Sequence, residues 1–106
     1  MGLSAIYSVN TIVDAVKHAD TYRYAASITG KSELIDLIVD AELAFKSADF
    51  TEQEQTVINC RVFGTLFQEE VAELLGVSQP RICQIEAEIN SKLQIILSRW
   101  EREYAD

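Results

Sequence analysis

Apolar residues recur at intervals of three and four over the last third of the chain, and this periodicity constrains the fold more than any other feature. They are Ile82, Ile85, Ile89, Leu93, Ile96 and Trp100. The spacing places them on one side of an α-helix, where they form a continuous buried stripe. Strand-like alternation is scarce in the chain, so the sequence predicts helices packed on helices and an all-α fold.

The residues before this stripe predict a second, shorter helix that meets the long one at a sharp turn. We expect the short helix at Gln68–Leu75 and the turn at Gly76-Val77-Ser78. Ala72 is small enough to let two steeply crossing helices approach each other. Gly76 can adopt the positive φ that reverses the chain, and Val77 would fill the space beneath the turn.

The start of the longer helix also has residue types that suit its position. Ser78 can cap the helix, and Pro80 lies in its first turn, where a missing N–H does no harm. These features together predict a helix-turn-helix, and an ordinary helical hairpin within a bundle is the alternative.

One face of the longer helix, near its N-terminus, is polar. It presents Ser78, Gln79, Arg81, Cys83, Gln84 and Ala87. In a helix-turn-helix these positions reach base edges and phosphates in a major groove. Glutamine can pair with adenine, and arginine with guanine or phosphate, so Gln79, Arg81 and Gln84 are the predicted base-contacting residues.

The rest of the chain predicts about five helices in total. A first helix is expected at Leu3–Ala19 and a break at Ser27–Gly30. Ser32 is expected to cap a helix that ends near Lys46. Thr51 and Glu54 fit a capping box, which begins another helix that ends at Gly64. The apolar face predicted for the helix after Ser32 consists of Leu34, Ile35, Ile38, Ala41 and Phe45.

These elements suggest two parts of the chain. Residues 1–49 form an N-terminal helical segment, expected to be a dimerisation or partner surface. Residues 50–106 form the helix-turn-helix with its long C-terminal helix. The connector Ser47-Ala48-Asp49 is too short for a flexible linker, so we expect the two parts to share a core.

Charge and cysteine content limit the possible functions. The formal charge of −8 and the pI near 4.5 oppose strong, non-specific DNA binding, which needs clustered Lys and Arg. Cys60 and Cys83 match no zinc or disulfide spacing, so reduced thiols are expected. With no secretory leader or membrane span evident, we expect a cytoplasmic protein without membrane contact.

No pattern in the sequence indicates catalysis. His18 is the only histidine and has no nucleophile or metal-ligand partner at motif spacing. Helix surfaces commonly bear carboxylates such as Asp14, Asp36 and Asp40, and no glycine-rich phosphate loop is present. We therefore expect no enzyme, no cofactor, no catalytic residues and no metal site.

The stretch GTLFQEEVAELLGVSQPRICQIEAEINSKL closely resembles the fourth domain of bacterial sigma factors. Matching features include Phe50-Thr51, Arg61, Gln68–Ala72, Arg81-Ile82, Gln84–Ala87 and Lys92-Leu93. The resemblance covers about half of the chain and implies a DNA-binding recognition helix and a second surface that grips a flap of RNA polymerase. Lys92 thereby joins Ser78, Gln79, Arg81, Cys83 and Gln84 as a predicted DNA-contacting residue.

The residues before Phe50 do not resemble the other sigma domains, so the chain is more similar to small sigma-like regulators such as those of phages and other mobile elements. The leading hypothesis is a sequence-specific DNA-binding transcription regulator, expected to form a homodimer. The alternative is an acidic interaction module that binds RNA polymerase, a sigma factor or a repressor without direct DNA contact.

Overall fold

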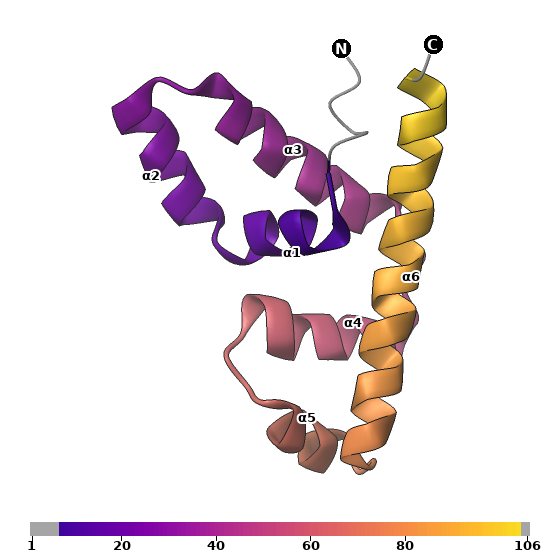
Figure 1. The fold of residues 1–106 in the computed structure, drawn as a ribbon. Helices are drawn as coiled ribbons and strands as arrows, with labels where there is room; N and C mark the ends of the chain where they lie inside the picture. Colours follow the sequence, from indigo (N-terminus) through magenta and orange to yellow (C-terminus); the bar gives the residue numbers. More distant parts are fainter. Residues whose placement is uncertain (1–6, 105–106) are drawn as a thin grey trace. The chain divides into compact units, whose positions relative to one another are not determined.

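The computed structural model describes residues 7–104, and this part of the chain is helical without strands. Six α-helices and one π-helical turn follow each other along the chain (Figure 1). They are α1 (Val9–Lys17), α2 (Ala19–Thr29), α3 (Ser32–Ser47), α4 (Glu52–Ile58), the π-helical turn η2 (Asn59–Phe63), α5 (Gln68–Leu75) and α6 (Gln79–Tyr104). The all-α prediction is confirmed, and the expected number of about five helices was slightly too low.

The extra helix comes from a break that the sequence did not reveal. The single helix expected at Leu3–Ala19 is α1, capped by Ser8, whose Oγ accepts from the Thr11 N–H at 3.1 Å. The residues of that prediction before Tyr7 lie outside the described part. At His18 the backbone leaves helical geometry (φ −118°, ψ 36°) and α2 begins directly afterwards. No glycine or proline marks this break.

Two predicted details of α3 were wrong. Ser32 is the first helical residue and not the cap, because Lys31 occupies the cap position and makes no side-chain capping bond. Ile35 was placed on the apolar face, but it is 39% exposed. The buried residues of α3 are Ile38, Ala41 and Ala44. The buried residues thus extend from the middle of α3 toward its C-terminal end.

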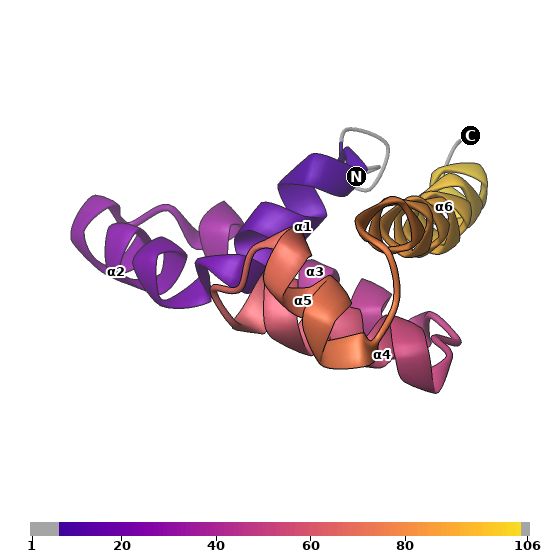
Figure 2. The ribbon, with the colours of Figure 1, turned by 90° about the horizontal axis from the view of Figure 1, so that it is seen from below.

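The described residues divide into two compact units. The first unit contains the residues up to Ala48 together with those from Leu93 onward, and the second unit is Asp49–Lys92. Helix α6, which Figure 2 shows nearly end-on, contributes its beginning to the second unit and its end to the first.

In the first unit, α2 and α3 form a hairpin that turns at Gly30, and α1 packs against α3 (Figures 1 and 2). The Tyr7 hydroxyl donates to Asp40 Oδ2 at 3.0 Å and joins the start of α1 to α3. The buried apolar residues include Ile12, Ala15 and Val16 of α1 and Leu93, Ile96 and Leu97 of α6.

The second unit begins with the predicted capping box. Thr51 Oγ1 accepts from the Glu54 N–H at 3.1 Å, and Glu54 Oε1 accepts from the Thr51 N–H at 2.9 Å. Two free amides at the N-terminus of α4 are thereby satisfied. Val57 and Ile58 are 1% exposed and form the buried apolar face of this helix.

The π-helical turn η2 ends where the chain passes very close to its own carbonyl groups. A Cβ on Gly64 would lie 2.8 Å from the Cys60 carbonyl oxygen. This oxygen also accepts from the Leu66 N–H at 3.2 Å, so the segment between η2 and α5 is tightly folded. Only glycine fits this close approach.

Candidate nucleic-acid interface

The chain reverses between α5 and α6 at a left-handed glycine. Gly76 has φ +68° and ψ 33°, a conformation that L side chains rarely adopt. The Gly76 N–H donates to the Glu73 carbonyl at 3.2 Å and the Val77 N–H to the Ala72 carbonyl at 3.0 Å. These bonds satisfy the last carbonyls of α5 and end the helix at the predicted residue.

Ser78 then caps α6. Its Oγ accepts from the Arg81 N–H at 3.3 Å, and its carbonyl accepts from the N–H groups of Arg81 and Ile82. Pro80 is the second residue of the helix, where its missing N–H leaves no acceptor unsatisfied. Both ends of α5, the turn Gly76–Ser78 and the start of α6 agree with the sequence prediction, whereas α6 continues to Tyr104, beyond the expected end at Trp100.

The first turns of α6 separate into a buried and an exposed side. Ile82 and Ile85 have no exposed surface, and Ile89 is 5% exposed. Five of the residues expected on the opposite face are exposed, namely Ser78, Gln79, Cys83, Gln84 and Ala87. The arrangement therefore presents polar side chains to solvent at the N-terminal end of a helix, beside a tight turn, which is the geometry that enters a major groove.

Arg81 lies at the edge of this face. Its side chain is 40% exposed, and its guanidinium donates to Gln84 Oε1 at 3.4 Å and to Gln53 Oε1 at 3.3 Å. A carboxylate oxygen of Glu88 lies 3.8 Å away. Each contact is long and partly solvated, so the guanidinium can exchange these partners for a stronger acceptor at little cost.

Comparison with known protein families supplies the decisive observation. The family model described as sigma-70, region 4 matches residues 48–103, which is more than half of the chain. The protein belongs to the sigma-70 region 4 family. Region 4 is a DNA-binding helix-turn-helix domain, and α5, the turn at Gly76 and α6 lie within the matched residues. Searches of curated proteins and of solved structures found no significant match.

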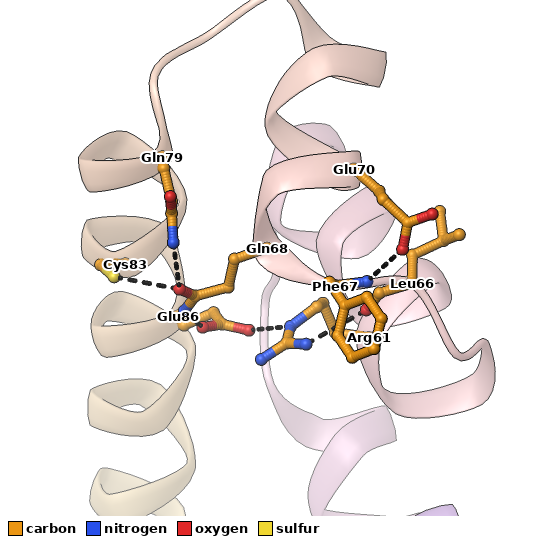
Figure 3. Close-up of polar contacts among 8 residues, drawn as sticks. All are labelled: Arg61, Leu66, Phe67, Gln68, Glu70, Gln79, Cys83 and Glu86. Carbon is orange, nitrogen blue, oxygen red and sulfur yellow. Dashed lines mark hydrogen bonds and ion pairs between the residues drawn. The ribbon is translucent and has the colours of Figure 1, made fainter.

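In this region 4 domain, a polar network connects α6 to α5 and η2 (Figure 3). Arg61 Nε donates to Glu86 Oε2 at 2.7 Å, and an Arg61 terminal nitrogen donates to the Leu66 carbonyl at 3.1 Å. Gln68 Nε2 donates to the other oxygen of Glu86. In the sequence, Arg61, Gln68 and Glu86 stand out only as features similar to those of sigma factors. No local signal shows that Arg61 and Gln68, which lie 25 and 18 positions before Glu86, converge on it.

Two predicted DNA-contacting residues join this network. Gln79 Nε2 donates to Gln68 Oε1 at 3.3 Å, and Cys83 Sγ lies 3.5 Å from the same oxygen. Both cysteines have free thiols, as expected. Gln79 and Cys83 therefore lie on the side of α6 that faces the N-terminus of α5 (Figure 3).

Lys92 lies away from these residues and makes contacts inside the second unit. Its Nζ donates to Glu54 Oε1 and, at 2.9 Å, to the Asp49 carbonyl, and it lies 5.9 Å from the centre of the Phe50 ring. Glu54 is only 4% exposed. Burial alone would raise the pKa of its carboxyl, but the bonds from Lys92 and Thr51 outweigh burial and lower the pKa below its ordinary value.

Positive charge is scarce around the motif. The second unit, Asp49–Lys92, contains eight carboxylates and three cations, a net charge of −5. All three cations have a carboxylate within ion-pair distance, because Arg61 contacts Glu86, Arg81 contacts Glu88 and Lys92 contacts Glu54. The electrostatic attraction to phosphates must therefore be small.

Residues 7–104 contain neither a cluster of metal-ligand side chains nor a helix that could span a membrane. No group of three or more His, Cys, Asp or Glu side chains converges as a metal site in this range. None of the helices described there is both long enough and apolar enough to span a bilayer.

Proposed function

We propose that this protein is a sequence-specific transcription regulator without catalytic activity, which inserts the N-terminal turns of α6 into the major groove of DNA. The observation that supports this most is the pairing of the left-handed turn at Gly76 with an exposed polar face on the first turns of α6. Membership of a DNA-binding family is consistent with it.

The chemistry of the exposed face suggests which bases it prefers. Arg81 can donate two bonds to guanine or bind a phosphate, and Gln79 and Gln84 can each donate to and accept from adenine. Ser78 and Cys83 flank these side chains and supply minor contacts. Our proposal does not include Lys92, because its ammonium group already binds the nearly buried Glu54 carboxylate.

A binding-site selection from random duplex DNA at low salt tests this function. We expect the wild-type chain to enrich a defined sequence and Arg81→Ala plus Gln84→Ala to lose about tenfold or more in affinity for it. The matched control is Arg99→Ala plus Gln94→Ala, which removes the same two residue types from exposed positions further along α6. Absence of any enriched sequence would refute the proposal.

The ion pairing of all three cations in the second unit favours a second candidate function. In this alternative the acidic surface binds a protein of the transcription machinery, such as RNA polymerase, a sigma factor or a repressor, without direct DNA contact. Affinity capture followed by mass spectrometry would separate the two functions. The alternative predicts that an identified transcription protein is retained after nuclease treatment, whereas the DNA-binding proposal predicts that nuclease releases it.

A further inference from the structure

The carboxylate of Glu86 is held by two donors from other elements. Arg61 Nε donates to one of its oxygens at 2.7 Å, and Gln68 Nε2 donates to the other. Arg61 is itself anchored on the Leu66 carbonyl at 3.1 Å. With both partners in place and only a quarter of its side chain exposed, Glu86 has little freedom to turn away.

This carboxylate determines which way the Gln68 amide points. An ionised carboxylate only accepts hydrogen bonds, so the donor end of the Gln68 amide must face Glu86. Its acceptor oxygen is then directed toward the first turns of α6. Two donors of α6 contact that oxygen, Gln79 Nε2 at 3.3 Å and Cys83 Sγ at 3.5 Å. The chemistry of every member of the network is consistent with this orientation (Figure 3).

The contact with Gln68 leaves Gln79 with the groups that an adenine contact needs. A glutamine amide has two N–H donors and one carbonyl acceptor. One N–H is used by Gln68, so one N–H and the oxygen remain. A bidentate contact with adenine uses one donor to N7 and one acceptor for N6–H. The contact with Gln68 therefore orients the Gln79 amide before DNA binds. Because Gln79 is exposed, its remaining N–H and its oxygen stay available for adenine.

We propose that Gln68 is a positioning residue that sets the base preference of Gln79, through a chain of bonds that begins at Arg61 and passes through Glu86. Gln68 itself needs no contact with a base. The inference rests on the proposed DNA-binding function and deepens it. It assigns an adenine preference to Gln79 and attributes that preference to the bonds that orient the Gln79 amide. The energetic benefit comes from ordering Gln79 before binding.

Binding-site selection with a set of variants tests this role. We expect Gln68→Met, which keeps the length of the side chain and removes its amide, to reduce the discrimination for adenine at one position of the site by about tenfold. Gln79→Ala should lose the preference at the same position. The double variant should be no worse than Gln79→Ala alone, because Gln68 acts only through Gln79. Gln94→Met, at an exposed glutamine of α6 that donates to Ser98 Oγ, is the matched control.

A second measurement on the DNA-free protein tests the contact directly. The side-chain amide resonances of Gln79 in ¹⁵N–¹H spectra should shift in Gln68→Met and stay unchanged in Gln94→Met. Gln68→Ala provides the same test if the methionine variant does not fold, which a thermal melt would reveal.

The outcomes separate this inference from the function on which it rests. If the wild-type chain enriches no sequence, the DNA-binding proposal fails and this inference fails with it. If it enriches a sequence and Gln68→Met keeps the full preference at every position, only the positioning role is refuted. A loss spread evenly over all positions would also refute it, since it would mark Gln68 as a general support of the fold. Loss confined to the position that Gln79 reads supports it.

Discussion

At the scale of single residues, two glycines in this chain have the same backbone conformation for the same reason. Gly76 ends α5 with φ +68° and Gly30 ends α2 with φ +72°. A Cβ at either position would meet no atom within 4 Å. A substitution there consequently tests backbone conformation alone, without steric contact.

We predict that Gly76→Ala and Gly30→Ala each lower the free energy of unfolding by about 1 kcal/mol, because alanine is strained at positive φ. Urea titration measures this effect. Only Gly76→Ala should also weaken DNA binding, since Gly76 sets the direction in which α6 leaves the turn. A Gly76→Ala variant with wild-type stability and affinity would contradict the role assigned to the turn.

The Glu54–Lys92 pair makes stability depend on pH. The pKa of the Glu54 carboxyl is lowered below its ordinary value of 4.5. A group with a lowered folded-state pKa stabilises the protein above its unfolded-state pKa, and this contribution decreases as the pH falls through the folded-state pKa. The contribution should therefore be complete at neutral pH and disappear in the acid range below the ordinary glutamate value.

We predict that Glu54→Gln is less stable than the wild-type chain at pH 7 and that the difference shrinks as the pH is lowered below the ordinary glutamate pKa. Lys92→Met should lower the free energy of unfolding at pH 7 by about 3 kcal/mol relative to the wild type, which is a larger loss than that of Glu54→Gln. It leaves a nearly buried carboxylate without its cation. Denaturant unfolding at several pH values measures both effects. A stability difference that does not change with pH would show that the ion pair has no such role.

At the scale of elements, the exposed side of α5 carries carboxylates that disfavour DNA binding. Glu69, Glu70 and Glu73 are exposed on it, and Phe67 and Leu74 are 70% and 64% exposed. Glu70 also accepts from the Phe67 N–H at 2.8 Å and so helps to begin the helix. In a helix-turn-helix the first helix crosses the DNA backbone. Carboxylates on this element repel phosphates.

We predict that Glu69→Gln plus Glu73→Gln raises the affinity for DNA several-fold at low salt, because two repulsive charges are removed near the backbone. Glu101→Gln plus Glu103→Gln makes the same change of charge at exposed positions in the last turns of α6 and is the control. Fluorescence anisotropy with a labelled duplex measures the effect. If the acidic surface binds a protein, the α5 variant should lose that partner and gain no DNA affinity.

Around the helix-turn-helix, helix boundaries were predictable because the chain provides local stop and start signals there. The limits of α5 follow from Gly76, and the start of α6 follows from Ser78 and Pro80, because these residues act on backbone groups within a few positions. The break at His18 has no such signal, and neither does the π-helical turn η2. These features went unpredicted because neither His18 nor the segment Asn59–Phe63 contains a glycine or proline that would mark a change in helix geometry.

At the scale of the whole molecule, the acidic charge limits how tightly a single chain can hold DNA. The sequence predicts a homodimer through the N-terminal helices, which would double the number of DNA contacts. Ile35, Val39 and Leu43 lie at intervals of four along α3 and are 39%, 56% and 50% exposed. Exposed apolar patches often mark protein–protein interfaces, so this row of aliphatic residues is where we expect the two chains to meet.

We predict that sedimentation equilibrium gives twice the mass of one chain for the wild type and the mass of a single chain for Val39→Glu. Thr21→Glu introduces the same charge at an exposed position of α2, on another helix than the row, and should leave the dimer intact. The charge in Val39→Glu would have to be buried in the interface, which is costly without a partner. A wild-type chain that stays monomeric at high concentration would rule out the homodimer.

The sequence alone determined the features of this protein that depend on near neighbours. The capping box at Thr51, the left-handed turn at Gly76, the cap at Ser78 and the isoleucine stripe of α6 follow from residue type and spacing, because the hydrogen bonds and periodicity involved span only a few positions. The tertiary structure alone decided which distant side chains meet. Glu86 binds Arg61 and Gln68, and Lys92 binds Glu54, 38 positions away. A charged or amide side chain can form hydrogen bonds or ion pairs with many different partners, so only the packing of the helices determines which partner it meets.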